Sequence, residues 1–165
     1  MTTKPRRMIS EAFDIKLLRS KDLPVALNMF RTTIKTINAR DYSDAELELW
    51  LSRVDLEKWE DRIRNDFFIK AENGKELVGF ASLKNGRYID LLYVHKDHQG
   101  RGIATLMLHT LIKKGVSEGH RSFDTHASKT AMPFFEKKGF RMIKSNTVGY
   151  GVMTLTNYLM NLELA

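Results

Sequence analysis

The sequence has 165 residues, no cysteine, and 27 lysines and arginines against 20 aspartates and glutamates, which gives a net charge of +7. This length is that of one domain with a single core, and the lack of cysteine excludes disulfides, thiolate metal sites and a cysteine nucleophile. The charge favours an anionic partner, but the basic pairs are scattered along the chain: Arg6-Arg7, Lys113-Lys114 and Lys137-Lys138. Scattered pairs are typical of solvated helix faces, so we expect no nucleic-acid partner.

No segment has the composition of a membrane span or a secretion signal. The longest apolar runs are well short of the roughly 18 residues that a spanning helix needs. The basic segment 1–11 lacks the apolar stretch of a signal peptide. We therefore expect a cytoplasmic protein without a membrane partner, with one domain over residues 1–165 and a flexible or loosely attached N-terminus at 1–11.

The first third of the chain reads as a strand followed by helices. Residues 13–18 alternate as a strand does, and Asp22 before Leu23-Pro24 predicts a helix start with proline in the first turn. Ser43 to Glu46 is a capping box that begins a second, short helix, and Asp55 is expected to cap a third. The first helix has one apolar face, with residues recurring at intervals of three and four: Leu23, Leu27, Phe30, Ile34 and Ile37.

Three apolar segments follow, at 67–69, 77–83 and 88–94. They are separated by Asn73-Gly74 and Asn85-Gly86, and Asn-Gly suits a type I′ hairpin turn. The pattern therefore predicts an antiparallel meander of three strands.

The last third predicts a helix at 103–117 and then a strand at 122–125 that lies parallel to the third strand of the meander, as a helical crossover requires. Ser128 or Thr130 caps the next helix. Thr130 is the better candidate, because Pro133 then falls in the first turn, where no N–H is needed. After that helix, the segments 140–143 and 152–162 predict a closing hairpin.

The stretch 91–104 carries the strongest functional signal, because an apolar strand runs into a glycine-bearing turn that opens a helix. Gly100 and Gly102 allow positive φ and close approach of a ligand, and the first N–H groups of the helix are available to an anion. The spacing Gln-x-x-Gly-x-Ala is formed by Gln99, Gly102 and Ala104. Two other phosphate motifs are excluded: there is no Gly-Lys-Ser/Thr, and Thr105 occupies the third glycine position of Gly-x-Gly-x-x-Gly.

This motif resembles the pyrophosphate-binding motif of the GNAT superfamily of N-acyltransferases, Gln/Arg-x-x-Gly-x-Gly/Ala. The order of the elements is that of the GNAT fold, and residues 127–140 resemble a second family motif, Asn-x-x-Ala-x-x-Phe-Tyr-x-x-x-Gly-Phe. Together with residues 88–94, they are similar to the YafP-like branch of bacterial GNAT proteins. The resemblance implies an α/β (α+β) fold with a central mixed, mostly antiparallel sheet of about seven strands flanked by helices.

The resemblance also implies an activity: transfer of the acetyl group of acetyl-CoA to a primary amine, expected to belong to a small molecule, directly in a ternary complex and without a metal. The resemblance is also compatible with a homodimer. Leu92, Tyr93 and Val94 would present backbone groups to the pantetheine arm and thioester, where the strand leaves its neighbour at a bulge. The pyrophosphate would be held by Gln99, Gly100, Arg101, Gly102, Ile103, Ala104 and Thr105, although Arg101 reads equally well as a solvated arginine.

The second motif departs from the family at two positions. Ser128 replaces an asparagine, and it would either bond the pantetheine or only cap a helix. Phe135 replaces the tyrosine that protonates the departing thiolate. Another hydroxyl would then serve, or the thiolate would leave as the anion and take a proton from water. The candidate hydroxyls belong to Tyr158, Tyr150 and Tyr93, with Tyr158 preferred because the last strand faces the acceptor cleft in this fold.

Asp90 and His126 are the candidate bases. Asp90 lies in a strand that is otherwise apolar on both faces, so its carboxylate either has a raised pKa or is satisfied by a neighbouring cation or tyrosine. His126 follows a strand next to the second motif, where an imidazole suits a base or relay, although most lone histidines have no catalytic role. The remaining histidines, His95, His98, His109 and His120, have no metal-ligand partners at useful spacing.

Two further points concern ligands. We expect the acceptor between the first helices and the closing strands, near the aromatic side chains of Phe30, Tyr42, Trp50 and Tyr158. The alternative to an enzyme is a GNAT-like module that senses acyl-coenzyme A without turnover, which the absence of the tyrosine at Phe135 keeps open.

Overall fold

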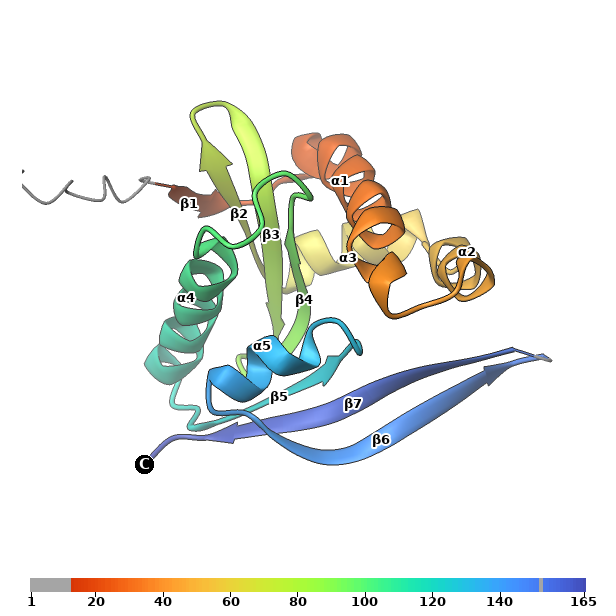
Figure 1. Ribbon diagram of the computed structural model, residues 1–165. Helices are drawn as coiled ribbons and strands as arrows, with labels where there is room; N and C mark the ends of the chain where they lie inside the picture. The colour runs from red at the N-terminus through yellow and green to blue at the C-terminus, as the bar shows by residue number, and fades with distance from the viewer. Residues whose placement is uncertain (1–12, 152) are drawn as a thin grey trace, which may run out of the picture.

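The computed structural model describes residues 13–151 and 153–165, and within them the sheet has seven strands in the order β1-β2-β3-β4-β5-β7-β6 (Figure 1). The strands are β1 (Asp14–Leu17), β2 (Phe67–Asn73), β3 (Glu76–Lys84), β4 (Tyr88–Val94), β5 (Ser122–Ala127), β6 (Arg141–Tyr150) and β7 (Met153–Glu163). The α-helices are α1 (Leu23–Thr36), α2 (Asp44–Ser52), α3 (Leu56–Asn65), α4 (Ile103–Ser117) and α5 (Met132–Lys137). The expected architecture is confirmed, and the segment 1–11 lies outside the described residues.

Helices cover both faces of the sheet, and each face has its own apolar cluster. On one face, α1, α2 and α3 contribute to a cluster that includes Leu27, Phe30, Ile34, Trp59 and Phe80. On the other face, α4 and α5 contribute to a cluster that includes Met107, Leu111, Phe123, Phe135 and Met160. None of the helices in the described ranges is long and apolar enough to cross a membrane.

The expected starts of α1, α2 and α3 are confirmed, with one difference in detail. The Ser43 hydroxyl accepts from the N–H of Glu46 at 3.2 Å while the Glu46 carboxylate accepts from the N–H of Ser43 at 2.9 Å, which is a capping box. Asp55 caps α3 through two backbone N–H groups. Asp22 occupies the N-cap position of α1, but its carboxylate accepts from the N–H of Arg19 in a preceding 3-10 turn and makes no cap bond to the helix.

The three-strand meander is confirmed, but only one of its turns has the expected form. In the second hairpin, Asn85 and Gly86 have φ of 53° and 72°, the positive values that a type I′ turn requires. In the first hairpin, Asn73 still belongs to β2, so the loop residues are Gly74 and Lys75, of which only the glycine has positive φ. The prediction of a type I′ turn at Asn73-Gly74 was therefore wrong.

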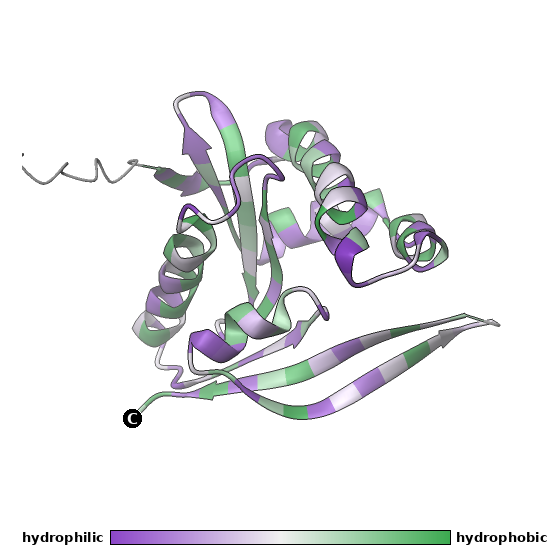
Figure 2. Ribbon diagram, viewed as in Figure 1, coloured by the Kyte–Doolittle hydropathy of each residue, from purple (hydrophilic) through white to green (hydrophobic). Residues whose placement is uncertain are grey.

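The closing hairpin is longer than expected. β6 was predicted at 140–143 and runs over Arg141–Tyr150, paired along its length with β7. Most residues of β6 are exposed, so no buried face imposes an apolar alternation that the sequence could display. Figure 2 shows hydrophilic and hydrophobic bands mixed along this hairpin, which extends beyond the helices.

Helix α4 lies so close to the sheet that only glycine fits at one contact. A Cβ atom on Gly115 would lie 2.4 Å from the carbonyl oxygen of Gly86 and 2.4 Å from Cε1 of Phe123. Both distances are far below van der Waals contact, and one of the neighbours is backbone. This contact therefore fixes the height of α4 above the strands that carry the site.

We predict that Gly115→Ala lowers the free energy of unfolding by about 1–3 kcal/mol through overpacking, although alanine is the better helix former by about 1 kcal/mol. Urea denaturation measures the change. The control is Gly149→Ala in β6, whose Cβ would meet nothing within 4 Å, and it should alter stability by less than about 0.5 kcal/mol. Equal stability of Gly115→Ala and the unsubstituted protein would contradict this contact.

Candidate functional site

The site is a cavity of about 690 Å³ at the place where two parallel strands separate. β4 and β5 are paired only at Tyr88–Asp124 and Ile89–Thr125. At the fork, the buried Thr125 hydroxyl donates to the carbonyl oxygen of Ile89 at 2.8 Å, which satisfies a group that the next strand no longer reaches. Beyond Ile89, the edge of β4 that faces β5 has no strand partner. This volume is in the range of small-molecule sites.

The bulge that the resemblance implied lies at Asp90. On the other side of β4, Ser82 pairs with Leu91 and Leu83 pairs with Ile89, so Asp90 is left without a partner residue in β3. A bulge bends its strand and re-aims the side chains next to it. The bend and the separation from β5 therefore occur at the same point of β4.

The turn after β4, which we call the cradle, has the backbone geometry expected of an anion site. Gly100 and Gly102 have φ of 72° and 79°, and a Cβ atom at either position would meet nothing within 4 Å. Gly102 is the N-cap of the 15-residue helix α4, and glycine has no side chain that could accept from the first N–H groups of the helix. Those N–H groups also have no acceptor within the helix. The positive end of the helix dipole adds to their attraction for an anion.

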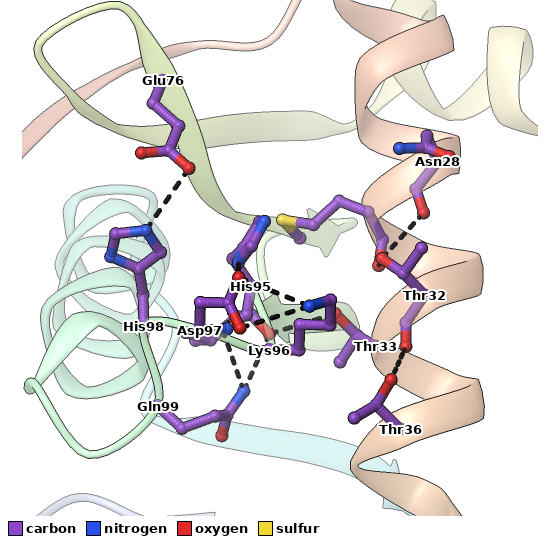
Figure 3. A network of polar contacts seen from close by, with 12 residues as sticks. Asn28, Thr32, Thr33, Thr36, Glu76, His95, Lys96, Asp97, His98 and Gln99 are labelled. Carbon is purple, nitrogen blue, oxygen red and sulfur yellow. Dashed lines mark hydrogen bonds and ion pairs between the residues drawn. The ribbon is translucent and has the colours of Figure 1, made fainter.

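Hydrogen bonds from two side chains fix the end of β4 beside the cradle. The Gln99 carboxamide donates to the carbonyl oxygen of Val94 at 2.8 Å, and the buried Thr33 hydroxyl of α1 donates to the same oxygen at 3.2 Å. Figure 3 shows Gln99 reaching back along the turn in this way. Gln99 therefore holds the turn in shape, a role that the motif alone did not indicate.

Most of the predicted site residues line this one cavity. The exceptions among the described residues are Arg101 and Tyr158. The guanidinium of Arg101 lies 5.3 Å from the ring centroid of Phe13 and contacts His98. The residues that do line it are Asp90, Leu92, Tyr93, Val94, Gln99, Gly100, Gly102, Ile103, Ala104, Thr105, His126, Ser128 and Phe135.

Tyr158 was preferred because the last strand was expected to face the acceptor cleft; that strand does line the cavity, but Tyr158 is not among its lining residues. Its ring packs against the core cluster beneath α4 and α5, on the same side of β7 as the buried Met160. The residues of β7 that line the cavity are Leu155, Thr156 and Asn157. Of the other two candidate hydroxyls, Tyr150 lines the cavity beneath the guanidinium of Arg53, 4.4 Å from its ring centroid.

Tyr93 lines the cavity but is a packed aromatic residue. Its ring makes edge contacts with Phe30 at 4.9 Å and lies 5.5 Å from that of Phe80, measured between centroids. Burial is the main cause that raises the pKa of its phenol, and the Asp90 charge adds to it. The phenol of Tyr93 is therefore a weaker acid than that of a free tyrosine, and its ring packs against the core cluster.

Asp90 is paired, which is one of the two alternatives for an acidic residue in an apolar strand. The Nε atom of Arg62, from α3, donates to Oδ2 of Asp90 at 2.7 Å, and both side chains are partly buried. The Arg62 guanidinium also lies over the Trp59 ring, 5.7 Å from its centroid. Nearby, burial and then the Asp90 charge raise the pKa of Asp66. Sequence analysis missed Arg62, one of several charged residues of α3.

His126 lies at the rim of the cavity and is bonded to a neighbouring phenol. Its Nδ1 is 2.7 Å from the Tyr88 hydroxyl, and the imidazole is exposed. Burial raises the pKa of Tyr88 to about 12. Tyr88 therefore stays neutral at physiological pH and orients the imidazole through a hydrogen bond without adding charge.

The start of α5 differs from the expectation. The Ser128 hydroxyl accepts from the N–H of Ala131 at 3.1 Å, whereas the Thr130 hydroxyl is buried without a hydrogen-bond partner among the described residues. Thr130 was therefore the wrong cap candidate, because the turn from Ser128 comes before the helix proper, which begins at Met132. Phe135 is 3% exposed and contributes a ring edge to the cavity wall.

Three of the four aromatic side chains that were expected near the acceptor lie along the cavity, at what we call its aromatic end. Phe30, Tyr42 and Trp50 line it together, and the rings of Tyr42 and Trp50 are 5.5 Å apart between centroids. The buried Tyr42 hydroxyl accepts from the N–H of Lys129 at 2.9 Å and donates to the carbonyl oxygen of Thr156 at 3.0 Å. One phenol thus joins the chain before α2 to the β5–α5 loop and to β7.

Two histidines have a partner that sequence spacing did not reveal. His98 Nε2 lies 3.4 Å from Oε1 of Glu76, and His95 lies next to both residues (Figure 3). The expectation that these histidines lack metal-ligand partners was therefore wrong. Glu76 is distant in sequence and reaches them only because β3 and β4 are antiparallel neighbours.

Comparisons with known proteins agree with this geometry. Residues 38–162 match the acetyltransferase (GNAT) domain. YafP of Escherichia coli K12, an uncharacterized N-acetyltransferase, is 31% identical over 132 residues, which is 80% of this chain and 83% of YafP.

Solved structures show the same fold. A GCN5-related N-acetyltransferase from Rhodopseudomonas palustris has a TM-score of 0.89 and 32% identity, over 95% of this chain and 99% of that one. The PaiA N-acetyltransferase of Thermoplasma acidophilum, in complex with coenzyme A, has a TM-score of 0.77 and 20% identity, over 92% and 99% of the two chains. With the domain match covering most of its length, this chain belongs to the GNAT family of acetyltransferases.

Proposed function

We propose that this acetyltransferase moves the acetyl group of acetyl-CoA to the primary amine of a small molecule, by direct transfer while both substrates are bound. The observation that carries the proposal is that the glycine cradle and the unpaired edge of β4 open into the same cavity. A molecule with a diphosphate at one end and a thioester at the other can occupy both at once. Its reactive carbon would then face the aromatic end.

The cradle suits a diphosphate for electrostatic and steric reasons. Free N–H groups at the start of α4 supply donors, and the helix dipole favours negative charge there. Gly100 and Gly102 leave open space where other residues would place a side chain. The complex of the PaiA relative with coenzyme A supports this assignment.

The edge of β4 suits the pantetheine arm and the thioester. After Ile89 this edge lies on the cavity without a strand partner, so backbone groups of residues 92–94 would bond an extended ligand as a neighbouring strand does. A backbone N–H there would polarise the thioester carbonyl and stabilise the oxyanion that forms on attack. The protein thus contributes mainly position and donors.

Asp90 is our candidate base for the amine. Arg62 donates to Oδ2, which holds the carboxylate in place and leaves Oδ1 to accept the proton from the attacking nitrogen, directly or through water. Attack forms the C–N bond and the tetrahedral oxyanion; collapse of the oxyanion then breaks the C–S bond, and the electron pair of that bond leaves with the sulfur. His126, exposed at the rim, would relay the proton to solvent.

The departing thiolate lacks a tyrosine partner at Phe135. The phenyl ring donates no proton, and Tyr158 lies outside the cavity lining. A thiol with a pKa near its free value of about 8.5 can leave as the anion and take its proton from water. Of the three candidate tyrosine hydroxyls, that of Tyr150 remains, since its residue lines the cavity and is only partly buried.

The aromatic end supports a small acceptor. Phe30, Tyr42 and Trp50 form its wall, and apolar surfaces of this kind suit a compact, partly apolar amine. The alternative function, a sensor that binds acyl-coenzyme A without turnover, is favoured by Phe135 alone. Release of free thiol from acetyl-CoA across a panel of small amines would exclude it, and tight binding without thiol release with any amine would exclude the enzyme.

We predict that Gly102→Trp weakens coenzyme A binding by about 100-fold or more, because the indole fills the cradle and the helix N–H groups become inaccessible. Isothermal titration with coenzyme A measures the effect. The matched control is Gly119→Trp at the other end of α4, which also has positive φ and open space around its Cβ. Equal affinities of the two variants would contradict the assignment of the cradle.

We predict that Asp90→Asn lowers kcat by about 10²–10⁴-fold, as expected for loss of a general base, while the affinity for acetyl-CoA is unchanged. Steady-state kinetics and titration measure the two quantities. Arg62→Gln is the control, because it breaks the same ion pair but keeps the carboxylate, and its kcat should fall much less. If both variants lose activity equally, in step with their loss of stability, Asp90 is structural.

A further inference from the structure

We propose that Glu76, His95 and His98 form a binding site for a divalent transition-metal ion such as Zn²⁺. Each residue offers one ligand atom, and these atoms all lie within 4.8 Å of one another. A carboxylate and two imidazoles form a donor set that suits Zn²⁺ and its neighbours. The proposed function assigns no role to these three residues, although His98 also lines the large cavity beside the cradle.

The fold brings the three residues together from two strands. His95 directly follows β4, and its N–H donates to the carbonyl oxygen of Val78 in β3, so the turn after β4 is attached to the start of β3. The N–H of His98 then donates to the carbonyl oxygen of His95 at 2.9 Å, which closes a tight turn. Both imidazoles therefore lie beside Glu76, the first residue of β3 (Figure 3).

The distances are close to those that an ion requires. Tetrahedral Zn²⁺ with bonds of about 2.0–2.1 Å places neighbouring ligand atoms roughly 3.3–3.4 Å apart. His98 Nε2 and Oε1 of Glu76 are already 3.4 Å apart. The two imidazole centroids are 5.1 Å apart with an interplanar angle of 79°, so a small rotation of the exposed Glu76 and the partly exposed rings completes the site.

The surroundings provide access and a hydrogen-bond acceptor for one imidazole. A second cavity of about 270 Å³, between α1 and β3, is lined by both Glu76 and His95, which gives an entry path and room for water ligands. Oδ2 of Asp97 lies 4.0 Å from His95 Nδ1. His95 Nδ1 now accepts from the N–H of Asp97 at 3.0 Å. Coordination through Nε2 would put the proton on Nδ1, so this backbone contact would be exchanged for one in which Nδ1 donates to the Asp97 carboxylate.

Binding of an ion would compete with an existing contact. The Arg101 guanidinium now contacts His98 Nδ1. A His98 that coordinates through Nε2 carries its proton on Nδ1 and cannot accept from arginine there. The ion would therefore turn the Arg101 side chain away from His98 and cross-link β3 to the turn that precedes the cradle.

Titration calorimetry with Zn²⁺ tests the proposal, using chelator-treated protein from which any histidine tag has been cleaved. The unsubstituted protein should bind one ion per chain with a micromolar dissociation constant. Glu76→Gln should weaken binding about tenfold or more, and His98→Ala should abolish it. His109→Ala, which removes an exposed histidine of α4 outside the cluster, should bind like the unsubstituted protein.

Two further measurements make the outcome independent of folding defects. Circular dichroism of the ion-free variants establishes that they are folded, and Glu76→Gln is a conservative change at an exposed position. Zn²⁺ should raise the Tm of the unsubstituted protein and of His109→Ala but not of folded His98→Ala. No saturable binding by the unsubstituted protein, or equal affinities of His98→Ala and His109→Ala, would overturn the site.

Discussion

The early end of the pairing between β4 and β5 is the constraint on which the site depends. Two residue pairs join these strands, and the bulge at Asp90 lies just beyond them. Because the strands separate there, backbone groups of β4 face a cavity instead of a neighbour, and the helix that starts after β4 points its N-terminus into the same space. The fold thus supplies binding groups from its main chain, while side chains decide the chemistry.

Much of the fold and of the coenzyme end of the site could be predicted from the sequence, because both depend on local signals. Apolar periodicity located the meander and α4, and two glycines located the cradle. What the sequence did not show depends on contacts between distant segments. Arg62 meets Asp90 from α3, Glu76 meets His98 across β3 and β4, and neither encounter leaves a pattern in the chain. Tyr158 shows the same limit, since the strand was predicted correctly but not which of its residues line the cavity.

Of the two departures from the family motif, Ser128 concerns local structure and Phe135 concerns the chemistry. Ser128 keeps a local role, because its hydroxyl organises the turn before α5. Phe135 keeps only the shape of the residue that it replaces, since its ring packs in the core and at the cavity wall without a hydroxyl. The second motif thus keeps its shape while one proton donor is missing, so the departure affects protonation of the leaving thiolate and not the form of the cavity.

The Tyr42 phenol links the two ends of the cavity. It donates to β7 and accepts from the β5–α5 loop, which only a neutral hydroxyl can do, and burial, the main influence on its pKa, raises that value. The wall of the proposed acceptor end and the loop beside the proposed coenzyme end are therefore one mechanical unit. Widening the acceptor end by moving the chain around Tyr42 would shift the opposite wall as well, so selectivity for a new amine is more easily acquired through side chains such as Trp50 than through movement of the backbone.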